Sequence, residues 1–129
     1  MFDYAAYAVA LRRELHQYPE IGFDLPRTLA LVRRELEDMG IPYTEEYGRS
    51  GIVAIINDGK PFTIGIRADM DALPITEATG LDYASKIDGQ MHACGHDMHT
   101  RRNVSSSASK RYSSTSALCS SPCFTSRPM

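Results

Sequence analysis

A helical spacing of apolar residues opens the chain. Positions separated by i, i+4, i+7 and i+11 share one face of a helix, and here they hold Tyr4, Ala8, Leu11 and Leu15. Asp3 is a good N-cap residue, while Pro19 cannot continue a helix. We therefore expect a helix between these two residues, with that stripe buried.

A second helix is predicted after a loop over residues 18–23. Asp24, followed closely by Pro26, provides a helix start. Gly40 ends the helix, because glycine readily adopts the positive-φ conformation that closes many helices. The expected buried stripe consists of Leu29, Val32, Leu36 and Met39.

Beyond Gly40 the pattern becomes that of strands. Residues 41–47 predict a short strand, and residues 48–51 a turn. Residues 52–56 are β-branched and apolar on both faces, which predicts a covered strand. Residues 57–60 read Asn-Asp-Gly-Lys, a hairpin signal, so residues 62–66 are expected to return antiparallel.

Length and charge divide the chain at residue 100. The 129 residues suffice for one domain and are too few for a catalytic domain plus a separate substrate domain. Residues 1–100 carry nine basic and sixteen acidic residues, with no basic face for nucleic acid, whereas residues 101–129 carry five basic and no acidic residues and ten serines. We expect at most one domain, with a globular composition over 1–100 that leaves strand edges uncovered when folded alone, and no packed structure over 101–129.

Nothing in the sequence predicts secretion or membrane insertion. The first four residues are acidic rather than basic, and no apolar run reaches the roughly 18 residues of a membrane span. The three cysteines are odd in number and widely spaced, unlike a disulfide framework. We expect a cytoplasmic protein without a membrane partner, in a reducing compartment that suits a metal-binding thiolate.

Candidate metal ligands are densest in residues 89–100, which read Gly-Gln-Met-His-Ala-Cys-Gly-His-Asp-Met-His-Thr. Cys94 and His96 flank one glycine, whose missing Cβ lets the backbone bend so that both side chains can converge on one ion. Thiolate and imidazole suit zinc, manganese, cobalt or nickel better than magnesium or calcium. Two ligands do not complete a site, and the alternative is that His92, His96 and His99 are surface or capping histidines.

Two aspartates follow the third expected strand. Asp69 and Asp71 stand at i and i+2, where ligand and catalytic groups gather beyond strand ends in open α/β sheets. An aspartate beside a metal-bound histidine can hold the ring in the right tautomer. The alternative is a polar loop with a helix cap. Residues 75–88 are expected to form a loop without chemistry of their own.

Three motifs together carry a family resemblance. They are Leu15-His-Gln-Tyr-Pro-Glu-Ile-Gly-Phe23, Ile66-Arg-Ala-Asp-Met-Asp-Ala-Leu-Pro-Ile75 and Met91-His-Ala-Cys-Gly-His-Asp97. In this order they resemble the start of the metal-dependent amidohydrolases that include hippurate hydrolase and the indole-acetyl amino acid hydrolases, in one metallopeptidase superfamily with the aminoacylases and glutamate carboxypeptidase. The resemblance implies an α/β fold, here the N-terminal part of a three-layer α/β/α catalytic domain, with an inserted lid domain that mediates dimers.

The resemblance also implies a reaction and a site. The substrate would be a small N-acyl amino acid whose amide bond is hydrolysed with two divalent ions, manganese or zinc, with cobalt and nickel as further candidates. Cys94 and His96 match the family's metal ligands, and Asp71 matches the acidic residue that supports the metal centre. One ion would polarise the scissile carbonyl, and the pair would lower the pKa of a bridging water.

The chain departs from the family beyond the third motif. The family takes its glutamate base and its remaining histidine and glutamate ligands from further downstream, but here no acidic residue follows Asp97 and no histidine follows His99. We therefore expect an inactive N-terminal fragment, with homodimers only in the full-length relative. The alternative function is a noncatalytic metal-binding or interaction module, in which Cys94 and His96 hold one ion and the basic tail makes contacts.

The sequence after Thr100 also differs from the apolar helix of the family. It reads Arg101-Arg-Asn-Val-Ser-Ser-Ser107, and a slip of one nucleotide would let its codons encode an Ala-Met-x-Leu-Leu segment instead. We hypothesise that residues 101–129 are an out-of-frame tail; the alternative is a serine-rich disordered linker. Cys119 and Cys123, with no candidate ligands nearby, are interpreted as incidental thiols.

Overall fold

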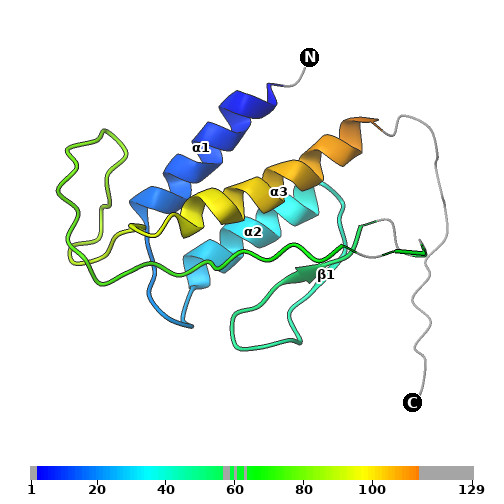
Figure 1. Cartoon of the computed structure of the whole chain (residues 1–129), viewed down its shortest axis with the longest axis horizontal. Helices are drawn as coiled ribbons and strands as arrows, with labels where there is room; N and C mark the ends of the chain where they lie inside the picture. Colours follow the sequence, from blue (N-terminus) through cyan, green and yellow to red (C-terminus); the bar gives the residue numbers. More distant parts are fainter. Residues whose placement is uncertain (1–2, 57–58, 60, 63, 114–129) are drawn as a thin grey trace.

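The computed structural model describes residues 3–56, 59, 61–62 and 64–113; for residues 106–113 it describes the backbone only. Its elements are α1 (Tyr4–Gln17), α2 (Pro26–Asp38), β1 (Tyr43–Thr44), β2 (Val53–Ala54) and α3 (His96–Ser113). The three helices lie side by side, and the β1–β2 hairpin lies below them in the view of Figure 1. Within the described residues, no helix is both long enough and apolar enough to span a membrane.

Helix α1 confirms the predicted start and end. The Asp3 carboxylate accepts hydrogen bonds from the backbone N–H groups of Ala5 and Ala6, both at 3.0 Å, which satisfies donors that the first helical turn leaves free. The helix ends at Gln17, before the proline. Of the predicted stripe, Ala8, Leu11 and Leu15 are buried and Tyr4 is half-buried.

The start of α2 differs from the prediction. Leu25 is the N-cap residue and makes no side-chain capping bond, so Asp24 does not cap the helix. The Glu20 carboxylate does so instead, accepting from the N–H groups of Arg27 at 3.0 Å and Thr28 at 2.9 Å. The loop preceding Pro26 folds back over the helix end, which no local spacing rule anticipates.

The end of α2 follows the prediction. Gly40 has φ +62°, and its N–H donates to the Glu37 carbonyl, while Ile41 N–H donates to the Leu36 carbonyl. This double hydrogen bond is the Schellman arrangement, which needs a residue that tolerates positive φ. Gly40 therefore ends the helix and turns the chain toward β1.

The strands are shorter and more exposed than predicted. β1 and β2 form an antiparallel pair with Tyr43 opposite Ala54 and Thr44 opposite Val53. Val53 and Ala54 are exposed, so the expectation of a covered strand over residues 52–56 is wrong in this structure. A covered strand needs a packed layer on each face, and the described residues supply no second layer over β2.

The predicted third strand is not formed among the described residues of 61–66. Phe62 and Ile64 are 88% and 86% exposed, so this apolar segment packs against nothing in the described chain. Residues 57, 58 and 60 of the predicted hairpin turn lie outside the described residues. The alternation that predicted the strand is present, but strand formation also requires a hydrogen-bonding neighbour.

Helix α3 crosses the predicted boundary at residue 100. It continues to Ser113, and Val104 is buried in the core, so the expectation of no packed structure after Thr100 is wrong for this part of the chain. Asp97, Thr100 and Val104 are buried at i, i+3 and i+7, a helical face that is mostly polar and therefore escaped the apolar pattern. Residues 114–129 lie outside the described residues, and the out-of-frame origin of the tail stays a prediction.

The core lies where the three helices meet. Its buried members come from all three helices and consist of Leu11, Leu15, Leu31, Val32, Leu36 and Val104. Leu31 was not in the predicted stripe of α2, whereas the predicted Leu29 and Met39 are only half-buried. This core fixes α3 against α1 and α2, and so fixes the segment that enters α3.

Candidate metal-binding site

Short backbone pairings bring the three motifs together. Ile21 and Ala72 form a parallel bridge, with the Ala72 N–H donating to the Glu20 carbonyl at 2.7 Å. Leu73 and Met91 form an antiparallel bridge and exchange two hydrogen bonds of 3.0 Å. The segment containing Asp71 is therefore held between the loop after α1 and the segment that leads into α3.

His96 and Asp71 are in direct contact. The Nδ1 atom of His96 lies 2.9 Å from the Asp71 carbonyl oxygen and 3.1 Å from Asp71 Oδ1. Both oxygens are acceptors, so Nδ1 carries the proton and the Nε2 lone pair of the neutral ring is left for a ligand. This geometry is what a metal-binding imidazole requires of its supporting carboxylate.

Cys94 and His96 line one cavity. The cavity has a volume of about 290 Å³ and is bounded by Arg67, Ala68, Asp69, Cys94, His96 and His99. The Cys94 thiol is free and exposed. Gly95, between the two ligands, has φ +84°, and a Cβ added there would approach Met98 Cε to 3.3 Å. The turn that lets the two side chains share a cavity is therefore one that favours glycine.

The donor set fits a transition ion but is incomplete. A thiolate, an imidazole and a supporting carboxylate suit zinc-like ions. In the part of the chain that the structure describes, no group of three or more histidine, cysteine, aspartate or glutamate side chains converges as metal ligands would. The described residues therefore supply two candidate ligands and a supporting carboxylate.

His92 is neither a surface nor a capping histidine. It is 4% exposed, and its two ring nitrogens have no hydrogen-bond partner among the described residues. Burial lowers the pKa of His92, against the opposing charge of Asp97, and His16 and His96 lower it further. A buried neutral imidazole with two unsatisfied nitrogens destabilises the fold.

Asp97 joins α1 to the start of α3. Its side chain is 0% exposed, and its Oδ2 atom lies 3.1 Å from Arg12 Nε and 2.8 Å from His16 Nδ1. Its other oxygen accepts the Met98 N–H at 2.9 Å. The buried charge is thus paired and fully hydrogen-bonded, as a buried carboxylate must be.

Glu77 extends this network into the loop before the cysteine motif. Its Oε1 lies 3.3 Å from His16 Nε2, and Oε2 accepts the Ser85 N–H at 2.6 Å. Burial raises the pKa of Glu77, but the hydrogen bonds from Thr79, Ser85 and His16 outweigh it, so the pKa is lowered overall. The expectation that residues 75–88 carry no chemistry of their own is wrong at this residue.

Neither His16 nor Glu77 was singled out from the sequence. A signal existed for the first, because Arg12 and His16 are one helical turn apart and so can reach the same acceptor. No comparable signal existed for Glu77, whose partners depend on the path of a loop.

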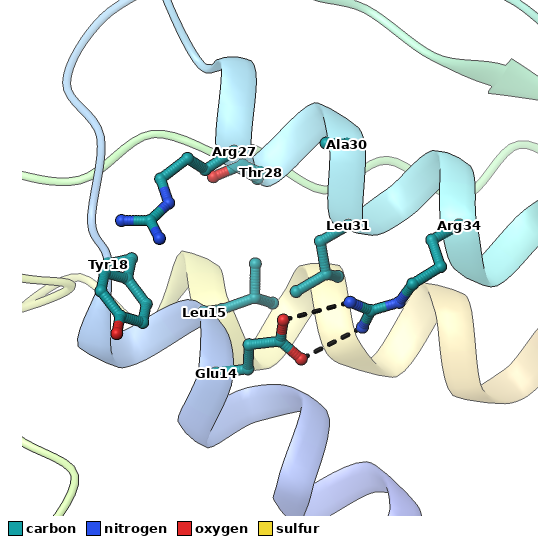
Figure 2. A pocket seen from close by; sticks show the side chains of 8 residues that line it. All are labelled: Glu14, Leu15, Tyr18, Arg27, Thr28, Ala30, Leu31 and Arg34. Carbon is teal, nitrogen blue, oxygen red and sulfur yellow. Dashed lines mark hydrogen bonds and ion pairs between the residues drawn. The ribbon is translucent and has the colours of Figure 1, made fainter.

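A larger cavity, of about 350 Å³, lies elsewhere. It is formed between α1 and α2 and is lined by Glu14, Leu15, Tyr18, Arg27, Thr28, Ala30, Leu31 and Arg34. Figure 2 shows Arg34 paired with both oxygens of Glu14 across it. Its lining contains no cysteine or histidine, so the smaller cavity is the candidate metal site.

Comparisons with known proteins agree with this geometry. Peptidase family M20/M25/M40 matches residues 65–105, which include Asp71, Cys94 and His96. The chain is 47% identical over 91 residues to hippurate hydrolase from Campylobacter jejuni, covering 70% of this chain and 24% of that protein. It is 46% identical over 97 residues to IAA-amino acid hydrolase ILR1-like 6 from Arabidopsis thaliana, covering 75% and 21%. The chain thus spans less than a quarter of the length of these curated relatives.

Solved structures show the same relationship. The YXEP protein of Bacillus subtilis, described as a dinuclear metal-binding peptidase of the M20 family, superposes with a TM-score of 0.78 at 38% identity, covering 85% of this chain and 31% of that chain. The α/β fold expected from the motifs, as the N-terminal part of such a catalytic domain, is therefore confirmed. Residues 65–105 thus match peptidase family M20/M25/M40, and the chain is similar to the N-terminal part of hydrolases and of a dinuclear metal-binding peptidase of that family.

Proposed function

We propose that this chain contributes the Cys94–His96 half of a two-metal site to an enzyme that hydrolyses the amide bond of N-acyl amino acids. The observation that carries the proposal is the contact of Asp71 with His96 Nδ1 beside the cavity that Cys94 also lines. The hippurate and IAA-amino acid hydrolases that it resembles act, by their names, on such conjugates.

Each proposed residue has a separate role. The Cys94 thiolate and the His96 Nε2 atom would hold metal, preferably manganese or zinc, while Asp71 fixes the tautomer and the direction of the imidazole. Divalent ions bound there supply Lewis acidity toward the amide carbonyl and a more acidic water. Arg67, Asp69 and His99 line the same cavity.

The proposed activity belongs to a polypeptide with the full set of ligands. The described residues bring only two candidate ligands together, and a general base is still required for hydrolysis. We therefore expect the 129-residue chain alone to release no benzoate from hippurate, with manganese or zinc added. Robust turnover by this chain would contradict the assignment of an incomplete site.

A chimera tests the proposal directly. Residues 1–100 of this chain would replace the corresponding segment of the Campylobacter jejuni hippurate hydrolase, and benzoate release would be measured with and without metal. We expect metal-dependent turnover, lost with Cys94→Ser and reduced about 10- to 100-fold with Asp71→Asn. Glu46→Gln, at an exposed position, is the matched control. Full activity of both site variants would contradict the proposal.

We also propose a cytoplasmic location. The exposed Cys94 thiol supports it, because a metal-binding thiolate needs a compartment that keeps it reduced. Fractionation of the native cells, with detection of peptides from residues 1–100, tests the location. Recovery in a secreted fraction would contradict it.

A further inference from the structure

Asp97, the residue next to the candidate ligand His96, is a fully buried carboxylate with three hydrogen-bond donors around it. Asp97 accepts from Arg12 Nε at 3.1 Å, from His16 Nδ1 at 2.8 Å and from Met98 N–H at 2.9 Å. Its side chain has no contact with solvent. Removing a carboxylate from water costs free energy, which hydrogen bonds of good geometry from its partners must offset.

These bonds join two elements immediately behind the ligand turn. Arg12 and His16 lie one turn apart on α1, so α1 presents two donors to one oxygen of the first turn of α3. An acidic residue in that turn also interacts favourably with the helix dipole. Because Asp97 follows His96, the first residue of α3, these bonds to α1 fix the position of His96 relative to α1.

The same network reaches the other side of the ligand segment. His16 places its second ring nitrogen 3.3 Å from Glu77, and Glu77 accepts the Ser85 N–H. The loop held in this way ends at Met91, which is paired with Leu73 just after Asp71. One imidazole therefore connects both flanks of the segment that contains Cys94 and His96.

We propose that Asp97, acting through His16 and Arg12, is a positioning residue that fixes the Cys94–Gly95–His96 turn in its metal-binding geometry. This inference rests on the proposed function of Cys94 and His96 as ligands. Asp97 is not among the residues that line the cavity of Cys94 and His96. It sets where the two ligands point, as residues surrounding a metal site do when they orient its ligands.

The first test titrates the full chain with Co²⁺ and follows the thiolate-to-cobalt absorption band. Asp97→Asn is expected to weaken Co²⁺ binding about tenfold or more, with the helical circular dichroism signal retained. The matched control is Glu35→Gln, because Glu35 is another buried carboxylate that joins two helices, accepting from Tyr7 and Arg34. We expect the control to lower the free energy of unfolding and to leave Co²⁺ affinity unchanged.

The second test uses rescue at His16. His16→Asn keeps an N–H donor near the Nδ1 position and should preserve Co²⁺ affinity, whereas His16→Ala should lose about tenfold. If Asp97→Asn fails to fold, the two His16 variants still test the positioning role, and equal Co²⁺ affinities in the two would contradict it.

The third test does not depend on metal. Hydrogen exchange should accelerate over residues 91–99 in His16→Ala and Asp97→Asn, with no change over α2. Exchange that accelerates equally over both regions, or Co²⁺ affinities that match between Asp97→Asn and Glu35→Gln, would overturn the positioning role. Absence of the cobalt band in the unmodified chain would instead contradict the ligand pair, and hydrogen exchange would then decide the role of Asp97 on its own.

Discussion

His96 and Asp71, 25 residues apart in the sequence, meet through a single ring nitrogen. Nδ1 faces both the carboxylate, at 3.1 Å, and the backbone carbonyl, at 2.9 Å, of the same aspartate. The carbonyl alone can hold the ring tautomer, while the carboxylate adds charge that makes the imidazole a better donor to a metal. The two contributions can therefore be separated by mutation.

Asp71→Asn keeps the carbonyl contact and removes the charge. We expect the Co²⁺ affinity of the chain to fall about tenfold, because the imidazole becomes less basic while its tautomer is retained. His96→Ala should abolish the thiolate–imidazole site altogether. The measurement is a cobalt titration followed by absorbance, with the exposed Asp82→Asn as control. Equal losses for Asp71→Asn and His96→Ala would show that the carbonyl contributes nothing.

Glu20→Ala should destabilise the chain through α2. It removes the acceptor for the N–H groups of Arg27 and Thr28, and losing a helix cap costs about 1 kcal/mol. Urea unfolding measures the change, with Glu46→Ala, an exposed position, as the matched variant. An unchanged midpoint in Glu20→Ala would mean that water replaces the cap at no cost.

His92→Leu should stabilise this chain. The substitution replaces a buried ring with two unpaired nitrogens by an apolar side chain, and relieving one unsatisfied buried group is worth about 1 kcal/mol or more. The same change at the exposed His99 should have little effect on unfolding. A destabilised His92→Leu chain would indicate that the imidazole has a partner, such as a buried water.

Glu77 should make stability depend on acid pH. Its pKa in the folded chain is below the ordinary value of 4.5, so the unfolded chain binds the proton more readily. Its contribution is therefore fully present above about pH 4.5 and is lost as the pH falls through the lowered pKa. Glu77→Gln should remove this part of the acid loss in urea unfolding followed across pH. A pH profile that matches the unmodified chain would contradict the assignment.

Val104→Ala tests the packed part of α3 beyond residue 100. Val104 belongs to the core cluster, and removing two buried methyl groups costs about 2 kcal/mol. Val9→Ala, at an exposed position of α1, is the control and should change the free energy of unfolding far less. Equal effects of the two variants would mean that α3 after Thr100 does not pack as described.

Local signals predicted α1, α2 and the candidate ligands of the site. Asp3 and Gly40 set helix ends through hydrogen bonds to near neighbours, and Pro19 does so because it has no N–H to continue the helix. Cys94 and His96 could be identified together because one glycine separates them, and their shared cavity agrees with that prediction. Their role as ligands stays a prediction.

Tertiary structure decided what depends on distant partners. The covered strand predicted over 52–56 lacked a layer to cover it, and the serine-containing helix after Thr100 gained a core contact at Val104 that its composition did not suggest. No signal in the sequence predicted the capping of α2 by Glu20 or the contact of Glu77 with His16. Periodicity shows only which faces of an element are apolar. Whether a charged side chain can be buried depends on the hydrogen-bond donors that the fold brings next to it. The sequence by itself thus determined both ends of α1, the end of α2 and the candidate ligands, and the packing of α1 against α3 decided where those candidate ligands lie.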